Sequence, residues 1–284
     1  MLDIRPKSAH FATSGKKNTT TTRRFTQHLP QEWSSDAFLR PPFSWLDDLY
    51  ALCCIKTWPD FNWLNADASL PVRFVSQQML DEQTLCYESF IHTYEQVPTR
   101  PQNWHDLFNA LIWKQFPRSK SALNRLHMTD INAVGSNQRT PRRNRITHFD
   151  ECGVLMIYST EEIPNLLKQH EWHAAFVDRR SDWGTRVQAL VFGHANYEML
   201  LKPYIGLTGK WLGIQVPKDY FSWDNKQQLA YVDEKLVERL EQQNCLGERG
   251  ALWPLPLLGV PGWWPDNEHA AFYANQNYFM PKRK

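Results

Sequence analysis

The sequence predicts a helix-rich α+β protein, and three observations lead to this fold class. Apolar residues recur every three or four positions in several segments, which is the spacing of one buried helix face. Two runs, PVRFVSQ at 71–77 and VLMIYS at 154–159, are rich in the β-branched and aromatic residues that favour strands. The segment LWPLPLLGVPGWWPDNEHAAFY at 252–273 holds too much proline and glycine for a helix, which predicts an extended C-terminal strap.

The helix pattern is clearest at 103–128, after a short helix expected from Ser44 and another over 81–96. Asn103 is a favourable N-cap, and Phe116-Pro117 should end the helix because proline disfavours helical geometry in the residue before it. Ser119 can then cap a second helix, so the stretch predicts an αα-hairpin. The apolar stripe of its first helix is Trp104, Leu107, Phe108, Leu111 and Ile112.

Five further elements are expected after this hairpin. NRITHF at 144–149 and VLMIYS flank Asp150-Glu151-Cys152-Gly153, which predicts a short β-hairpin. Ser159-Thr160-Glu161-Glu162 fits a capping box that opens a helix to about His170. Residues 183–201 are apolar nearly all round and predict one long central helix. A turn and strand at 205–214 and an amphipathic helix at 226–243 complete the series.

The composition indicates the class of protein and the cellular compartment in which we expect it. No apolar run approaches the roughly 20 residues of a bilayer-spanning helix, and the N-terminus lacks the apolar stretch of a secretory signal. The five cysteines are odd in number and show no CxxC spacing, which argues against a disulfide framework or a thiolate zinc site. We therefore expect a cytoplasmic protein without membrane association.

Charge is unevenly distributed along the chain. We expect residues 1–30, with KKNTTTTRR, to form a disordered basic arm, residues 31–281 a single globular domain, and residues 282–284 a basic tail. A second basic patch, residues 114–145, carries Asp130 as its single acid and ends in the expected loop SNQRTPRRNR. This patch predicts either a contact with a polyanion such as nucleic acid or a solvated loop without a ligand.

Several ionisable residues fall on faces that should be buried. His194 and Glu198 are four residues apart on the central helix, and a buried carboxylate without partners costs several kcal/mol. In the αα-hairpin, His105, Asn109 and His127 should lie within about one turn of each other. These side chains either form a catalytic pocket or satisfy one another in a polar core. In the pocket, His105, His127, His194 and Glu198 would be acid/base groups or ligands of a divalent metal ion, with Asn109 orienting an imidazole.

The tandem His105-Asp106 resembles the motif of the HD superfamily of metal-dependent phosphohydrolases, which makes Asp106 a further catalytic candidate. That superfamily also needs an upstream histidine and a downstream aspartate. His92 stands too close upstream, and no helical aspartate follows. Asp106 is equally explained as an acid in the first helical turn, where the helix dipole favours negative charge.

The substrate-binding candidates are basic or aromatic. Arg118, Lys120, Arg142 and Arg143 could engage an anionic substrate, and Trp263 of the GWW segment could stack on a sugar or base. The chain contains no GxGxxG, GxSxG or HExxH motif, so dinucleotide, serine-hydrolase and HExxH metalloprotease chemistry lack support.

Taken together, four segments resemble a bacterial family known as domain of unknown function 3025. They are VPTRPQNWHDLFNALIWKQFPRSKSALNRLH, ITHFDECG, VFGHANYE and PLLGVPGWWPDNE, and they span about residues 70–280. Asn144 and His148 depart from the family pattern, where aspartate and leucine are expected. The resemblance implies a bacterial cytosolic protein but no mechanism, because the family has no established function.

The leading functional hypothesis is a hydrolase- or lyase-type enzyme. Its pocket would lie between the αα-hairpin and the segment 183–201 and would use the His/Glu groups, with or without a divalent metal ion. One alternative is a protein that binds nucleic acid or another polyanion through residues 114–145 and the basic arm. The other is a non-catalytic, partner-binding scaffold.

Overall fold

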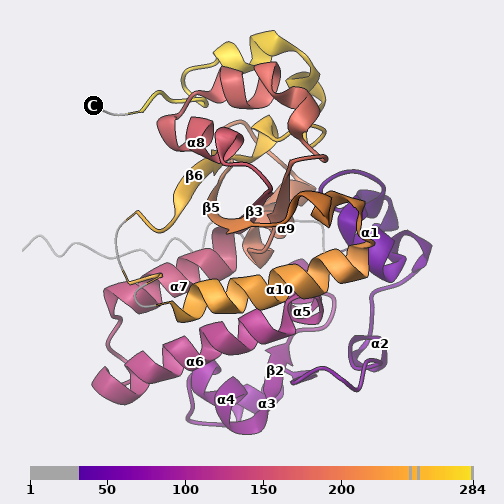
Figure 1. Ribbon diagram of the computed structural model, residues 1–284. Helices are drawn as coiled ribbons and strands as arrows, with labels where there is room; N and C mark the ends of the chain where they lie inside the picture. The colour runs from indigo at the N-terminus through magenta and orange to yellow at the C-terminus, as the bar shows by residue number, and fades with distance from the viewer. Residues whose placement is uncertain (1–31, 243–244, 248–249, 283–284) are drawn as a thin grey trace, which may run out of the picture.

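The computed structural model describes residues 32–242, 245–247 and 250–282 (Figure 1). The predicted basic arm 1–30 lies outside these residues, as do the last two residues of the tail. The division into arm, domain and tail stays a prediction. The α-helices are α1 (Ser44–Tyr50), α2 (Phe61–Leu64), α3 (Gln78–Asp81), α4 (Tyr87–Tyr94), α5 (Trp104–Gln115), α6 (Pro117–Val134), α7 (Pro141–Cys152), α8 (Glu162–Gln169), α9 (His194–Leu201) and α10 (Asn225–Glu241).

The strands form two small sheets. In the larger sheet, in the order β4-β3-β5-β6, β3 runs antiparallel to β4 and parallel to β5, and β6 is antiparallel to β5. In the smaller one, β1 and β2 pair in parallel. Helices with small sheets confirm the predicted helix-rich α+β class. The strand bounds are β1 (Arg73–Ser76), β2 (Gln96–Thr99), β3 (Gly153–Tyr158), β4 (Val187–Val191), β5 (Thr208–Gln215) and β6 (Trp253–Pro256).

The predicted αα-hairpin is present as α5 and α6. Asn103 caps α5 by accepting a hydrogen bond from the Asp106 amide at 3.0 Å. The second helix begins at Pro117, earlier than expected, and Ser119 does not cap it. Instead, the Asp233 carboxylate of α10 accepts hydrogen bonds from the Arg118 and Ser119 amides at 3.0 and 2.9 Å, so α10 is fixed across the start of α6.

The helices lie mostly in one half of the molecule and the larger sheet in the other (Figure 1). Between them α9 packs against both α5 and α7. The Phe108 ring of α5 stacks on the Tyr197 ring of α9 with centroids 5.3 Å apart. Burial of these rings in a continuous apolar core fixes α9 against the hairpin.

The predicted β-hairpin at 144–159 is wrong. Residues 144–152 belong to α7, and β3 pairs with β4 and β5 instead. The Thr140 hydroxyl accepts a hydrogen bond from the Arg143 amide at 3.0 Å, and Pro141 occupies the first turn. A threonine cap followed by proline is a helix-start signal that outweighs the strand-like composition of NRITHF. It also means that the second half of the expected loop SNQRTPRRNR, from Pro141 on, is helical.

The predicted long helix at 183–201 is also wrong. Residues Val187–Val191 form β4, and the helix begins only at His194. A short apolar run has no periodicity that separates a buried strand from a buried helix, and here Gly193 divides the two. Similarly, the helix expected over 81–96 is the shorter α4, followed directly by β2. The helix expected before His170 is α8, but no capping-box bond forms at its start.

The C-terminal segment contains β6 followed by short 3-10 turns (Leu257–Gly259, Pro265–Glu268 and Ala270–Ala274). Asn267 ties the strap to itself by donating from Nδ2 to the Leu258 and Val260 carbonyls at 2.9 and 2.7 Å. Across the described residues, none of the helices combines the length and apolar character needed to cross a membrane.

Candidate metal centre

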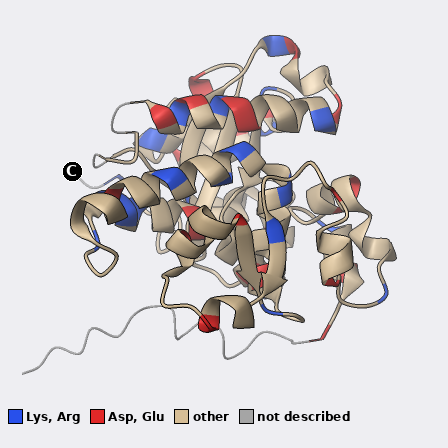
Figure 2. Cartoon of the chain, turned by 90° about the horizontal axis from the view of Figure 1, so that it is seen from below, with Lys and Arg blue, Asp and Glu red and all other residues tan. Residues whose placement is uncertain are grey.

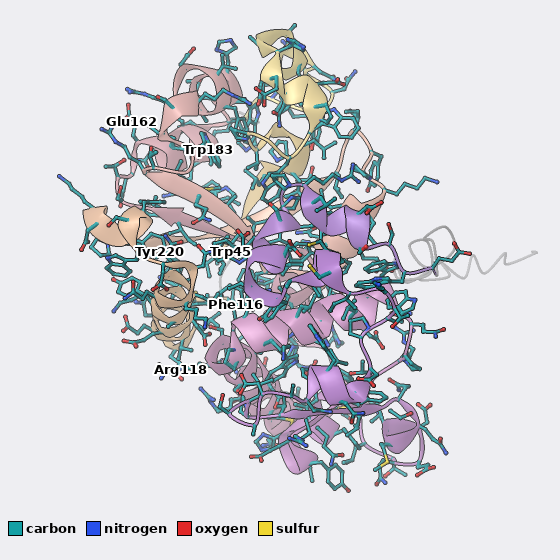
Figure 3. All side chains as sticks on the ribbon, turned by 90° about the vertical axis from the view of Figure 1, so that its right-hand side faces the viewer. Trp45, Phe116, Arg118, Glu162, Trp183 and Tyr220 are labelled. Carbon is teal, nitrogen blue, oxygen red and sulfur yellow. The ribbon has the colours of Figure 1, made fainter. Side chains whose placement is uncertain are left out.

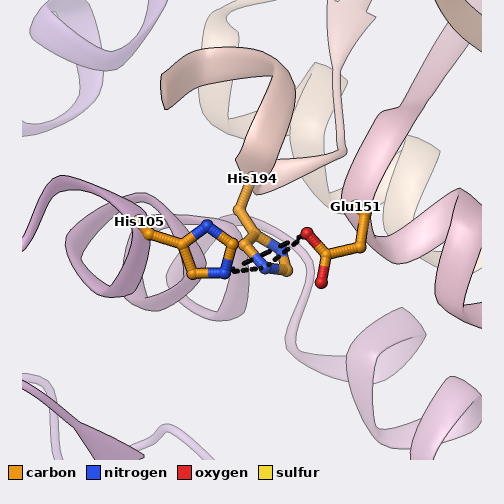
Figure 4. A group of neighbouring side chains, drawn as sticks. All are labelled: His105, Glu151 and His194. Carbon is orange, nitrogen blue, oxygen red and sulfur yellow. Dashed lines mark hydrogen bonds and ion pairs between the residues drawn. The ribbon is translucent and has the colours of Figure 1, made fainter. Parts of the chain in front are cut away.

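Three elements bring ionisable side chains to one point. His105 is the second residue of α5, Glu151 lies at the end of α7, and His194 is the first residue of α9. These side chains face one another from three directions (Figure 4). They are far apart in sequence, so the tertiary fold alone assembles the group.

Two glycines allow this approach. The Phe192 and Gly193 amides both donate to the Gly153 carbonyl, at 3.0 and 2.8 Å. A Cβ atom on Gly193 would lie 2.4 Å from the Glu151 carbonyl oxygen and 2.4 Å from the Gly153 nitrogen. Since no real side chain tolerates such distances to backbone atoms, glycine at 193 is what lets α9 begin beside the end of α7.

The geometry of the three facing atoms fits a metal ion. The two histidine Nε2 atoms are 3.1 Å apart, and the Glu151 Oε2 atom lies 3.5 Å from that of His194 and 4.0 Å from that of His105. A triangle with these sides has a centre about 2.1 Å from every corner, which matches zinc–nitrogen and zinc–oxygen bond lengths. In the described part of the chain, His105, Glu151 and His194 are the group whose donor atoms converge in this way.

Each histidine has a carboxylate behind it. Nδ1 of His105 donates to Glu198 Oε2 at 2.9 Å, which leaves the lone pair of its Nε2 facing His194 and Glu151. Nδ1 of His194 lies 4.0 Å from Asp150 Oδ2, beyond hydrogen-bond distance, and this buried atom has no hydrogen-bond partner. Glu198 thus orients the His105 imidazole as the carboxylates around histidine metal ligands usually do, whereas Asp150 adds only a nearby negative charge to His194.

The pKa values of the two histidines are shifted in opposite directions. Burial disfavours the charged form of His105, but the Glu198 hydrogen bond and the Glu151 charge outweigh burial and raise the His105 pKa. Burial, and then the neighbouring His105, lowers the pKa of His194 well below its ordinary value. The two rings are nearly perpendicular, at 77°. The carboxylates beside His105 therefore favour its charged form, whereas burial favours the neutral form of His194, which is the form that binds a metal ion.

A buried polar network supports the Asp150 side of the centre. The Lys120 ammonium, on a residue only 4% exposed, donates to Asp150 Oδ1 and to Asn109 Oδ1, the latter at 3.0 Å. The Asn109 amide in turn donates to the Tyr87 hydroxyl at 3.0 Å. Burial would raise the pKa of Asp150, but the charges of Lys120 and His194 lower it below its ordinary value.

The centre opens into a cavity of about 430 Å³. His127 lies in its wall, with Nε2 3.7 Å from Glu88 Oε1. Asp106 lies there as well and accepts Arg100 Nε and Nη2 at 2.9 and 2.8 Å. The cavity thus brings together most of the predicted catalytic residues, namely His105, Asp106, Asn109, His127 and His194. Glu198 stands behind His105.

The predicted substrate-binding residues do not gather around this cavity. Arg118 lies against Glu234 at the outer edge of the helices (Figure 3). Arg142 pairs with Asp130, and the buried Arg143 donates to the Ser136 and Gln138 carbonyls. Lys120 lies behind Asp150. Trp263 lines a different pocket, beside Trp45 and Trp183.

The basic patch 114–145 is likewise dispersed. Figure 2 shows its lysine and arginine residues spaced along the helices, next to a helix that carries acidic residues, rather than gathered in one block. Arg125 pairs with Glu241 at 2.9 Å, and Arg118 pairs with Glu234 at 3.5 Å. A carboxylate beside a cation offsets its charge and so weakens its attraction for a polyanion.

Sequence reasoning missed Glu151. The strand-like residues on either side of it predict the turn of a β-hairpin, where an acidic residue needs no function. The available signal was the sequence Thr140-Pro141, which starts a helix and so carries Glu151 to its end. The metal candidates His127 and Glu198 do not belong to the converging group: His127 lines the same cavity, and Glu198 hydrogen-bonds to His105.

The fold and the centre define a helix-rich α+β protein with a two-histidine, one-carboxylate group at the meeting of α5, α7 and α9. The family model described as Protein of unknown function (DUF3025) matches residues 72–283, so the chain belongs to this family. The match includes all of the residues of the centre. No curated protein and no solved structure matches the chain.

Proposed function

We propose that this protein is a divalent-metal-dependent enzyme of hydrolase type, with the ion held by His105, His194 and Glu151. The observation that carries the proposal is the common point about 2.1 Å from the three donor atoms, which is a metal–ligand distance. Two imidazoles and a carboxylate are the ligand set of hydrolytic zinc sites and also of facial iron(II) sites.

An ion with three protein ligands keeps a position open for water or substrate, and it supplies Lewis acidity and a water molecule of lowered pKa. The residues of this chain supply the rest. Glu198 holds His105 in the tautomer that presents Nε2, and Asp150 stands behind His194. The adjoining cavity provides room for a substrate beside the open position.

The first experiment measures the metal content of protein purified without chelators, by elemental mass spectrometry. We expect close to one zinc, iron or manganese ion per chain, and loss of that ion in His194→Ala and in Glu151→Gln. His173→Ala is the matched control, because this exposed histidine lies outside the centre. Circular dichroism of each variant shows whether the fold is retained.

The activity test follows on ion-loaded protein with ester, amide and phosphoester substrates. Hydrolysis that disappears in folded Glu151→Gln supports the proposal. If folded wild-type protein neither retains nor rebinds a divalent ion, the metal-dependent function is refuted.

A further inference from the structure

The cavity next to the centre is electronegative. Of the described residues in its wall, Glu88, Asp106, Asp150 and Glu151 are acidic, and Arg100 supplies the guanidinium. Glu198 and Lys120 lie directly behind the wall. These residues are five carboxylates and two cations, so their net charge is −3, and a bound divalent ion would still leave a net charge of −1.

Both cations are already engaged. The Arg100 guanidinium is held by Asp106 through two side-chain bonds, and the same carboxylate accepts the Arg100 amide at 2.6 Å. The Lys120 ammonium is shared between Asp150 and Asn109. An anionic substrate therefore finds no unpaired ammonium or guanidinium among the described residues of the wall.

Glu88 is the carboxylate without a strong counter-charge. No lysine or arginine of the described residues pairs with it, and its Oε2 accepts from the Asn124 amide at 3.1 Å. Its other oxygen lies 3.7 Å from His127 Nε2, beyond hydrogen-bond distance. The side chain is 26% exposed, so a ligand in the cavity can reach it.

His127 adds an independent observation at the same end of the cavity. The residue is only 4% exposed, and its Nδ1, which solvent does not reach, has no hydrogen-bond partner. A buried polar atom without a partner costs roughly 1–3 kcal/mol, so this imidazole is held in the cavity wall at a cost in stability, as a group kept for a ligand would be.

We infer that the substrate of this centre carries a cationic amine or amidine, which Glu88 and His127 bind while the bond to be hydrolysed lies at the ion. This inference rests on the proposed function and names its substrate class. Phosphoesters and other anionic substrates are disfavoured, because the cavity has no free cation to receive them and its carboxylates repel them.

The test uses hydroxamates, which bind metal ions through the hydroxamate group whatever the rest of the molecule is. Hexanohydroxamic acid, its ω-amino derivative and its ω-carboxy derivative are titrated calorimetrically into zinc-loaded protein, with ω-amino compounds of shorter and longer chain. We expect at least one ω-amino compound to bind about tenfold more tightly than the neutral compound of the same length, as a partly desolvated ion pair should. The ω-carboxy compound should bind more weakly than the neutral one.

Glu88→Gln should remove the preference for the amine and leave the affinity of the neutral compound unchanged. Glu82→Gln, an exposed glutamate outside the cavity wall, is the matched control and should keep the preference. Because Glu88 is partly exposed and glutamine has the same shape, this variant should fold, which thermal unfolding verifies.

The outcomes separate the two proposals. If the neutral compound binds but no ω-amino compound of any length binds more tightly, or if the ω-carboxy compound is preferred, the substrate class is refuted and the metal centre stands. If no hydroxamate binds to protein that has been offered zinc, the metal centre is refuted and the inference falls with it.

Discussion

Glu198 provides the sharpest test of the centre, because it supports a proposed ligand without being one. Its side chain is 9% exposed and accepts the His105 Nδ1 proton at 2.9 Å. In Glu198→Gln the amide oxygen can still accept this proton, but the negative charge that makes the imidazole a better ligand is lost. We expect a ten- to hundredfold weaker metal affinity, which is roughly 1.4–2.7 kcal/mol.

The assay is a competition for zinc between the protein and a chromophoric chelator, with Glu171→Gln as an exposed-glutamate control. Folding of Glu198→Gln should be retained, because the substitution preserves shape and removes a buried charge. A zinc affinity within about threefold of wild type would refute the outer-shell role of Glu198. A loss as complete as in His194→Ala would instead mean that Glu198 itself binds the ion.

Three further predictions concern the elements that hold the centre in place. Lys120→Met should lower the free energy of unfolding by about 3 kcal/mol in urea titrations, because it leaves the Asp150 carboxylate without its buried partner. An effect below about 1 kcal/mol would contradict the role of this ion pair. Gly193→Ala should weaken zinc binding as strongly as the substitution of a ligand, because the added Cβ atom would lie 2.4 Å from the Glu151 carbonyl oxygen and would move His194 away. An unchanged zinc affinity would refute this requirement for glycine and show that the backbone adjusts freely. The folded-state pKa of Asp150 is lowered, so its contribution to stability is fully present above the unfolded-state pKa of about 3.9 and is lost as pH falls through the folded-state value. The stability difference between wild type and Asp150→Asn, measured by urea unfolding at a series of pH values, should therefore shrink on acidification, and a difference that is constant with pH would exclude this linkage.

Local signals predicted the αα-hairpin and failed at two other elements for identifiable reasons. Around Trp104 the apolar spacing, the Asn103 cap and Pro117 all agree, and α5 begins and ends where they indicate. At 144–149 the strand-like residues conflicted with the helix-start signal at Thr140-Pro141, and the helix won because the cap satisfies a backbone amide directly. At 187–191 the apolar run carried no period, and pairing with β3 made it a strand.

The candidate site also has one part that local sequence signals predict and one part that they do not. The position of His105 on the first turn of α5 and the shared face of His194 and Glu198 follow from helical spacing, which depends only on neighbours in the chain. Their meeting with Glu151 does not. It depends on α7 continuing to Cys152 and on Gly193 lying against its last turn.

The sequence by itself determined the fold class, the family and the presence of buried histidines with acidic neighbours. The tertiary structure alone decided which of them face one another, because it brought Glu151 to the two imidazoles and placed Glu198 behind His105. It also paired most of the basic residues that had suggested an anionic ligand with acidic residues of the chain itself. The physical reason is that a donor atom must lie within a few tenths of an ångström of its place around a metal ion, whereas periodicity fixes a side chain only to one face of its own helix or strand.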